Sequence, residues 1–484
     1  MDLASGTTWH NADGESGKPE TPLPFTAFLA TFPLTLRSLR FVSLLVFAAL
    51  AVIGRATESI PPLKFEQRTL PNGLQLVWLE DHSSPTVAIQ IWYKVGSKDD
   101  PPGRSGFAHL FEHIMFKSTK HMPSEFFDRL TEDVGGENNA YTADDVTVFH
   151  ETVPSNNLER LLWAEAERLR DLTVDVHNFM LERNVVEEEY RQRVLAEPYG
   201  EFGEFIQKKS FAEHPYKRPT IGNIEELEAS SLGEVRAFHT TFYRPDNAVL
   251  VVVGDFEPAQ LQGWVDQYFG TIPKPAEPIP RVTTKEPPRT APQTITEYDA
   301  RVPLPALAVT YLGPSITAPD AASLRIAEEV LGGGESSRLY QKLVYETQLA
   351  QSAEFSADLR QDLGLLTFEI ILSSGAPIEK VKKVLFEEIA KISAAPITGA
   401  ELTIARNQLL ASKLLERETF EGKAETLAEA AAVYGDTNRA NTDLADLQAV
   451  TPAQVQEACK KWFQNPLIID YLPEAMKAKG KGKK

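Results

Sequence analysis

The run His109-Leu-Phe-Glu112-His113 constrains the fold of this chain more than any other part of its sequence. Side chains four residues apart share one face of an α-helix, so a helical run here would point both histidines at one metal ion. Glu112 stands beside the second histidine, where its carboxylate could hold a water molecule on the same ion. The sequence therefore predicts a helix that begins near Ser105 or Gly106 and carries two metal ligands and an acid–base group.

The histidine and cysteine content limits the side chains that could bind a metal, and the net charge limits the class of partner. Cys459 is the only cysteine, so the chain has no intrachain disulfide and no cluster of thiolate ligands. All nine histidines lie at or before His239, which places any histidine site in the first half. A metal site must therefore combine histidines with carboxylates. The net charge of −19 provides no basic field for phosphates and argues against a nucleic-acid-binding protein.

The beginning of the chain has the composition of a leader. Residues 1–24 are polar and turn-rich, which predicts disorder. Arg37 and Arg40 precede an apolar run that is shorter than the roughly 20 residues of a membrane span but suits the core of a signal peptide. We interpret residues 1–57 as a leader with a signal-peptide-like segment at 37–56, and expect a periplasmic or secreted protein. Its mature chain should have no stable membrane span, although an uncleaved leader that anchors the chain in a membrane is an alternative.

Alternating apolar and polar residues predict strands on both sides of the candidate metal helix. Residues 65–80 alternate around the turn Pro71-Asn-Gly73 and predict a β-hairpin, and the segment from Thr86 predicts a further strand. After the glycine pair that begins at Gly135, residues 139–142 have the pattern of a polar strand at the edge of a sheet.

A helix predicted from Asn178 to about Leu195 contains the candidates for a third ligand. Starting from Glu182, helical periodicity places Val186 and Glu189 within about 40° of it, and a second valine about 60° away. A carboxylate on a face that becomes buried is costly unless it is paired or bound to a metal. Glu182 and Glu189 are therefore the carboxylates to consider.

The neighbouring glutamates have simpler interpretations. Glu187 and Glu188 project to other sides of the helix, and we expect them on a solvated acidic face. For Glu189 the alternative to metal binding is an ion pair with Arg191 or Arg193.

The second half of the chain repeats the order of elements in the first. Seven prolines between residues 273 and 293 predict a linker. Beyond it follow a strand at 306–314, a helix at 318–331, helices near 338–350, 378–394 and 398–418, and a last strand at 467–472. Arg325 and Glu329 replace the histidines, and Ser412 stands where Glu189 stands in the first copy. The predicted parts are a metal-binding domain at 62–270, a linker at 271–293, a domain without metal at 294–475 and a basic tail at 476–484.

These markers together resemble the pitrilysin/insulinase family of zinc peptidases, and most of all its bacterial branch of processing-peptidase-like proteins. The order His-x-x-Glu-His is that of the inverzincins. Glu189 follows the second histidine at the family's distance of 76 residues. The resemblance covers about residues 62–475. Softer markers are Asn139-Ala140-x-Thr142, His214-Pro-Tyr216, Tyr243-x-Pro-x-Asn247 and Val253-Gly-Asp255.

The resemblance implies an α+β fold and a set of site residues. The fold would be two homologous domains, each a largely antiparallel sheet covered by helices on one face, which enclose a peptide chamber. His109, His113 and Glu189 would bind one Zn²⁺ per chain, Glu112 would be the general base, and Glu182 would support the ligands from behind. Such a protein is a zinc metallo-endopeptidase that hydrolyses peptides or unfolded segments.

The resemblance also gives the strand at 139–142 a function. Asn139, Ala140 and Thr142 would lie on the edge strand to which an extended peptide substrate pairs through its backbone.

One departure from the family pattern bears on partners. Relatives that work alone, and non-catalytic partner subunits, carry an Arg and a Tyr in the second half as Leu-Arg-x-x-x-x-Leu-x-Tyr. Val344 and Gln351 occupy these places here. We therefore predict the metal-bearing subunit of a heterodimer, whose homologous partner supplies the Arg/Tyr pair. The alternative is a non-catalytic peptide-binding or assembly subunit of the same fold.

Overall fold

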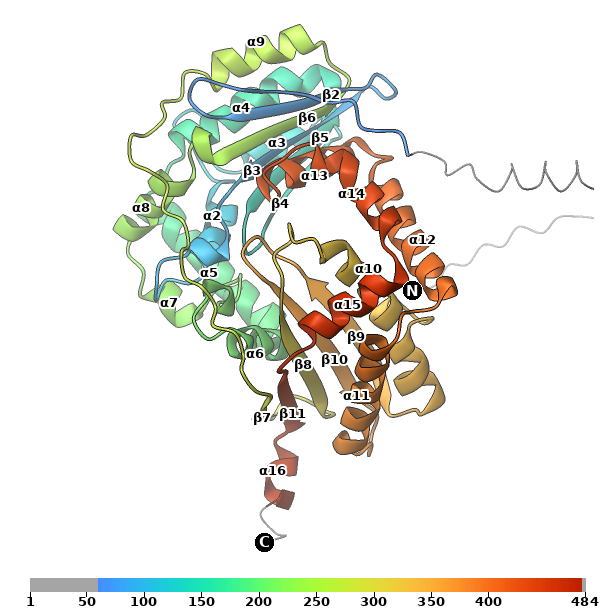
Figure 1. Cartoon of the computed structure of the whole chain (residues 1–484). Helices are drawn as coiled ribbons and strands as arrows, with labels where there is room; N and C mark the ends of the chain where they lie inside the picture. The colour runs from blue at the N-terminus through green and yellow to red at the C-terminus, as the bar shows by residue number, and fades with distance from the viewer. Residues whose placement is uncertain (1–59, 481–484) are drawn as a thin grey trace, which may run out of the picture. The chain divides into compact units, whose positions relative to one another are not determined.

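The computed structural model of the chain describes residues 60–480. The leader predicted at 1–57, with its signal-peptide-like segment, lies outside the described residues. No helix among the described residues is long and apolar enough to cross a membrane. The described residues from Pro62 onward form one compact unit, whose strands make two sheets (Figure 1).

The first sheet has six strands in the order β1-β2-β6-β3-β5-β4. β2 and β6 run parallel, and the other neighbours run antiparallel. The predicted hairpin at 65–80 is present, with Glu66 opposite Trp78. The strand predicted at 139–142 lies at the edge of the sheet, as expected. The strands are β1 (Glu66–Thr69), β2 (Gln75–Glu80), β3 (Thr86–Tyr93), β4 (Glu137–Thr142), β5 (Thr147–Pro154) and β6 (Ala248–Gly254).

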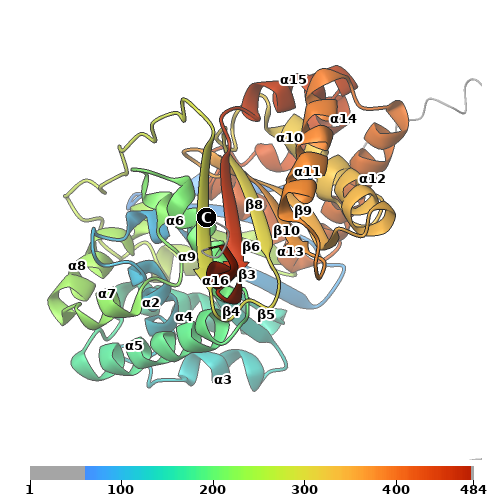
Figure 2. The same ribbon diagram turned by 90° about the horizontal axis from the view of Figure 1, so that it is seen from below.

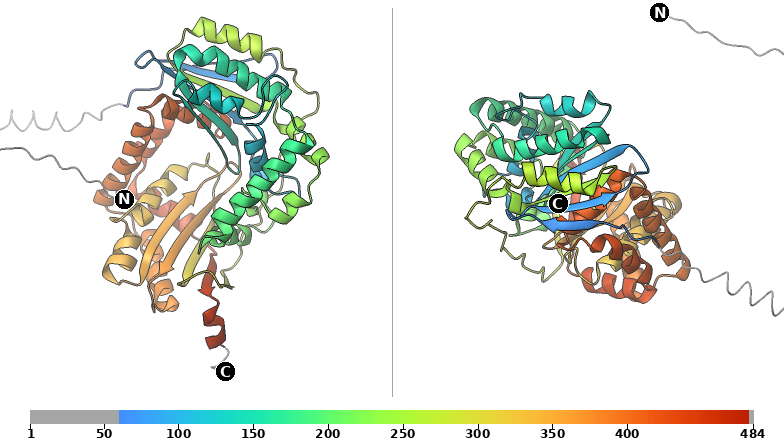
Figure 3. Two further views of the ribbon diagram at one scale, coloured as in Figure 1. Left: turned by 180° about the vertical axis from the view of Figure 1, so that it is seen from behind. Right: turned by 90° about the horizontal axis from the view of Figure 1, so that it is seen from above.

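Alternate residues of the first sheet belong to two different cores. Ile89 and Ile91 of β3 join a core with the helices of the first half, which include α2, α4, α8 and α9. Ala88 and Trp92, on the opposite face, pack against α13 of the second half. α13 is rich in alanine, whose small side chain lets the helix lie close to the strands. Figures 1 and 3 show the strands between these two layers. The helices are α2 (Phe107–Ile114), α4 (Leu158–Asp171), α8 (Leu232–Phe242), α9 (Pro258–Tyr268) and α13 (Phe420–Ala432).

The second sheet repeats the topology of the first. Its order is β7-β11-β8-β10-β9, again with one parallel pair, β7 and β11, and with β9 at the edge that β4 occupies in the first sheet. Helices α10, α11 and α15 accompany it (Figure 2). These elements are β7 (Gln293–Asp299), β8 (Ala306–Gly313), β9 (Ala350–Asp358), β10 (Gly364–Leu372), β11 (Leu467–Pro473), α10 (Ala321–Gly332), α11 (Ile378–Ala394) and α15 (Pro452–Trp462).

The predicted α+β class with two largely antiparallel sheets is thus confirmed, and the structure adds a helix of the second half on the first sheet. The division into domains at 271–293 stays a prediction. The range predicted for the helix near 338–350 is longer than the observed one. The π-helical turn there spans Tyr340–Glu346, and Ala350 already begins β9. The remaining helices are α3 (Phe126–Glu132), α5 (Val176–Tyr190), α6 (Gly200–Ser210), α7 (Ile224–Glu228), α12 (Gly399–Glu416), α14 (Arg439–Ala449) and α16 (Ala475–Gly480).

Candidate metal centre

The histidine-bearing helix α2 begins where the sequence predicts. Gly106 has a φ of +97°, a left-handed conformation that suits glycine, and a β-carbon there would come within 3.0 Å of the Gly222 backbone. The Asp100 carboxylate accepts hydrogen bonds from the N–H groups of Gly106 (2.6 Å) and Ala108 (2.9 Å). It thereby satisfies donors that have no partner within the helix. Asp100 therefore fixes the start of α2, a role that no motif in the sequence indicated.

Helices α2 and α5 bring the three predicted ligands together. The Nε2 atoms of His109 and His113 lie 3.7 Å and 3.2 Å from Oε2 of Glu189. One ligand atom from each residue lies within 4.8 Å of the other two. Two imidazole nitrogens and one carboxylate oxygen form a donor set that suits zinc and leaves a fourth position open. The residues present therefore fit the predicted ion.

The pKa shifts of His109 and Glu189 suit metal binding. Burial, together with the neighbouring His113, lowers the pKa of His109 to about 4. Its imidazole is therefore neutral near pH 7, and only the neutral ring can donate a lone pair to a metal. The contact with His113 lowers the pKa of Glu189, which keeps this group a carboxylate.

Glu112, the predicted general base, lies next to the predicted ligands and accepts a hydrogen bond from the edge strand β4. Thr142 Oγ1 donates a hydrogen bond of 2.7 Å to Glu112 Oε2, and the same oxygen lies 3.9 Å from His109 Nε2. Burial raises the pKa of Glu112. This bond connects β4 to α2, so Thr142 has a contact within the site in addition to its predicted place on a strand that pairs with a peptide.

Glu182 lies behind the ligands, and Lys117 joins it there. The Glu182 side chain is only 3% exposed, with Oε2 3.7 Å from His113 Nδ1. Lys117 Nζ lies 3.1 Å from Glu182 Oε1 and offsets the buried charge. Sequence reasoning missed Lys117, although its position four residues after His113 on the same segment was a signal.

The alternatives for the neighbouring glutamates have mixed outcomes. Glu189 makes the ion pair of the alternative, because Arg193 Nη1 lies 2.6 Å from its Oε1, while its other oxygen faces the two histidines. Glu188 is exposed as expected. The expectation of a solvated Glu187 is wrong, since this side chain is 8% exposed and lies 3.3 Å from Arg191. Its partners, Arg183 and Arg191, lie four residues before and after it on the same helical segment, a spacing that the sequence already contained.

Comparisons with known proteins place this geometry in a family. The family described as Insulinase (Peptidase family M16) matches residues 76–223, and the Peptidase M16 inactive domain matches residues 230–409. The chain is 30% identical to Zinc protease PqqE of Helicobacter pylori over 396 residues, which are 81% of this chain and 86% of that protein. The chain belongs to the M16 peptidase family.

The chain is also similar to a solved structure and to a eukaryotic peptidase subunit. A crystal structure of a protease from Helicobacter pylori matches with a TM-score of 0.81 and 27% identity, covering 85% of this chain and all of that one. A probable mitochondrial-processing peptidase subunit beta of Arabidopsis thaliana is 24% identical, over 82% of this chain and 75% of that protein. The M16 assignment confirms the resemblance that the sequence motifs indicated.

The edge strand β4 offers free backbone groups beside the centre. β4 pairs with β5 on one side, and within the described residues no strand pairs with its other side. Asn139 and Ala140 lie in this strand, and the Asn139 side chain accepts a hydrogen bond from the Ala140 N–H. An extended peptide could pair with the open side of β4.

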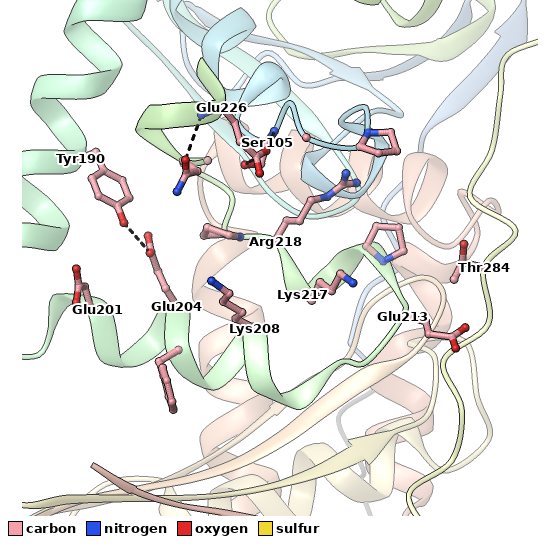
Figure 4. A pocket seen from close by; sticks show the side chains of 17 residues that line it. Ser105, Tyr190, Glu201, Glu204, Lys208, Glu213, Lys217, Arg218, Glu226 and Thr284 are labelled. Carbon is pink, nitrogen blue, oxygen red and sulfur yellow. Dashed lines mark hydrogen bonds between the residues drawn. The ribbon is translucent and has the colours of Figure 1, made fainter. Parts of the chain in front are cut away.

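A separate pocket of about 700 Å³ lies beyond the third ligand (Figure 4). None of the predicted site residues lines it, but Tyr190, which follows Glu189 in the chain, does. Tyr190 donates a hydrogen bond of 3.0 Å to Glu204 Oε2, and the other Glu204 oxygen is buried without a hydrogen-bond partner. Burial raises the pKa of Glu204 to about 7.

The variant Glu204→Gln is expected to be more stable than the wild type at alkaline pH. The raised pKa means that the folded chain keeps this proton more tightly than the unfolded chain. The wild type therefore loses stability as pH rises from the unfolded value through about 7. The amide can still accept the Tyr190 hydrogen bond and has no charge to bury. Thermal unfolding should place the variant's Tm above that of the wild type by about 2 °C at pH 8, with little difference at pH 4.

Glu213→Gln is the matched control, because Glu213 lines the same pocket but is exposed. It should leave the pH dependence of the Tm unchanged. A constant difference between Glu204→Gln and wild type at all pH values would contradict the assignment.

Proposed function

We propose that this chain is a zinc metallo-endopeptidase that hydrolyses extended peptides or unfolded segments. One observation carries the proposal: the Glu189 carboxylate faces both histidine Nε2 atoms, with Glu112 beside them and bonded to the edge strand. A purely structural role gives no reason for two imidazoles and two carboxylates to converge beside an open strand edge.

The residues divide the chemistry among them. His109, His113 and Glu189 would hold a zinc ion, which as a Lewis acid would polarise a peptide carbonyl and lower the pKa of water. The Glu112 carboxylate, which Thr142 holds in place, takes the proton of the attacking water and returns it to the leaving amine. Burial raises the pKa of Glu112 and makes it a better proton acceptor than an exposed glutamate.

The same proposal includes a compartment and a partner. The signal-peptide-like segment at 37–56 supports a periplasmic or secreted enzyme. Val344 lies in the π-helical turn Tyr340–Glu346 and Gln351 in β9, where neither can supply the positive charge or the phenol of the family's Arg/Tyr pair. The similarity to a protein described as a subunit beta supports a catalytic subunit that works with a homologous partner.

The double variant Val344→Arg and Gln351→Tyr is expected to raise the activity of the isolated chain. These side chains would supply the groups that hold the substrate carbonyl, and one such donor is worth about 10²-fold in kcat. The measurement is kcat/KM on an unstructured peptide, with and without a homologous protein that carries the Arg/Tyr motif. We expect the partner to raise the kcat/KM of the wild type, and to raise that of the double variant by a smaller factor.

Tyr345→Arg with Gln341→Tyr provides the control, since both positions are exposed on the same segment. This control should not raise activity. Full activity of the isolated wild type would contradict the heterodimer but not the peptidase.

A further inference from the structure

The turn between β9 and β10 lies against the first sheet of the molecule. Arg360 Nη1 lies 3.2 Å from Asp144 Oδ2, and the Gln361 N–H donates a hydrogen bond of 3.0 Å to Asp145 Oδ2. Asp144 and Asp145 form the turn that joins β4 to β5. Asp362 Oδ2 accepts a hydrogen bond of 3.2 Å from Lys98 Nζ. A segment of the second half thus holds the end of the strand proposed to bind the peptide.

Buried charged side chains fix the position of the β9–β10 turn relative to the β4–β5 turn. Lys98 and Asp145 are 9% and 8% exposed, and their charged atoms lie 2.7 Å apart. Tyr216 donates a hydrogen bond of 2.6 Å to Asp145 Oδ1, the oxygen that Lys98 contacts, and accepts one of 3.2 Å from the Asp362 N–H. Buried ions are tolerated only where their partners are well placed, so a shift of the turn would leave charges unpaired.

The Arg360 side chain has partners on both sides of this turn. Its guanidinium lies 4.9 Å from the ring centre of Tyr216 and 5.6 Å from that of Phe211. It also pairs with Asp358 at the end of β9. The side chain is 9% exposed. Arg360 therefore joins the second sheet, the aromatic residues before α7, and the β4–β5 turn.

A second contact from the same half reaches β4 itself, near its end. Tyr141, the neighbour of Thr142 in β4, donates a hydrogen bond of 2.7 Å to Glu425 Oε1 on α13. β4 is therefore held at two points by residues that lie far away in the sequence. Thr142, which bonds Glu112, lies between them.

We propose that Arg360 and Asp362 of the second half are positioning residues for the catalytic groups of the first. They fix the β4–β5 turn, and through Thr142 they fix the Glu112 carboxylate and the edge of β4 to which the peptide pairs. This inference rests on the proposed peptidase function. It gives the half without histidines a role in catalysis that does not require it to touch the metal or the substrate.

The expected effect is on turnover more than on folding. A displacement of about 1 Å in a reacting group can cost about 10²-fold in rate. Arg360→Gln should therefore lower kcat by about 10–10²-fold with zinc retained, and KM should rise because the pairing edge of β4 loosens. Arg360→Lys keeps the charge opposite Asp144 and should recover part of the rate.

Lys382→Gln is the matched control. Lys382 and Asp470 form a pair of similar burial, 13% and 12% exposed and 2.8 Å apart, within the second half. The control should lower the Tm as much as Arg360→Gln does, without the loss of kcat. The assay uses the full chain with whatever partner the wild type requires.

Amide hydrogen exchange of residues 138–142 gives a readout that does not depend on activity. Exchange there should speed up in Arg360→Gln, and not in Lys382→Gln, by at least about tenfold. Unchanged exchange of β4 in Arg360→Gln overturns the inference whatever the activity. If the wild type cleaves nothing with any partner, the proposed function fails, and the exchange measurement still decides whether the turn fixes β4.

Discussion

Glu112→Gln should lose peptide hydrolysis while the chain keeps its zinc. The amide is close in size to the carboxylate and can still accept the Thr142 hydrogen bond, so the site should keep its shape. It cannot take a proton from water, and a general base of this kind contributes about 10²–10⁴-fold to the rate. The measurements are kcat/KM on an unstructured peptide and the zinc content of the purified chain.

Glu188→Gln is the control for this variant, because Glu188 is exposed on α5 and has no contact with the ligands. It should cleave as the wild type does. Activity of Glu112→Gln within a factor of about three of wild type would exclude Glu112 as the base. A wild type that contains no zinc would instead support the non-catalytic subunit, since a scaffold needs no ion.

Local periodicity was sufficient to predict which side chains come together at the candidate metal centre. The spacing of His109 and His113 needs only one helical turn, and helical phase selects Glu182 and Glu189 because α5 is regular between them. The same phase predicts burial of Val186, which is fully buried. The other valine, Val185, is 42% exposed, because the buried face of α5 is narrower than the wheel suggests.

The contacts that the sequence could not show are those between distant segments. Nothing local to Asp144 indicates that Arg360 will pair with it, and the alanines of α13 carry no sign that they pack on the first sheet. The bond from Thr142 to Glu112 joins a strand to a helix 30 residues away. Such contacts depend on the tertiary arrangement, which a single sequence does not encode in any short pattern.

The two halves share the order of their strands, but only the first has the candidate ligands. β4 and β9 occupy the same edge in the same strand order, so both halves had the framework for a strand-pairing site. In the second copy Arg325 reaches Tyr434 and Asp443, contacts within its own half. The helix that carries ligands in one half therefore carries structural ion pairs in the other.

Removing the third ligand with Glu189→Gln should release zinc, the other large effect that we expect. The two histidines would remain, but the site would lose its only anionic ligand. Zinc added to the wild type should raise its Tm, since an ion at 100 times its Kd stabilises the folded state by about 2.7 kcal/mol. The variant should show no zinc-dependent rise in Tm, and its zinc content should fall towards zero.

The neighbouring glutamates make this test discriminating, because three adjacent carboxylates have three different environments. Glu187→Gln removes a buried partner of Arg183 and Arg191 and should lower the Tm while zinc stays bound. Glu188→Gln should change neither quantity. Zinc retained in Glu189→Gln but lost in Glu187→Gln would contradict the assignment from helical phase. Loss of zinc in Glu189→Gln alone would identify Glu189 as the ligand among the three glutamates. A general weakening of α5 should affect Glu187→Gln at least as strongly.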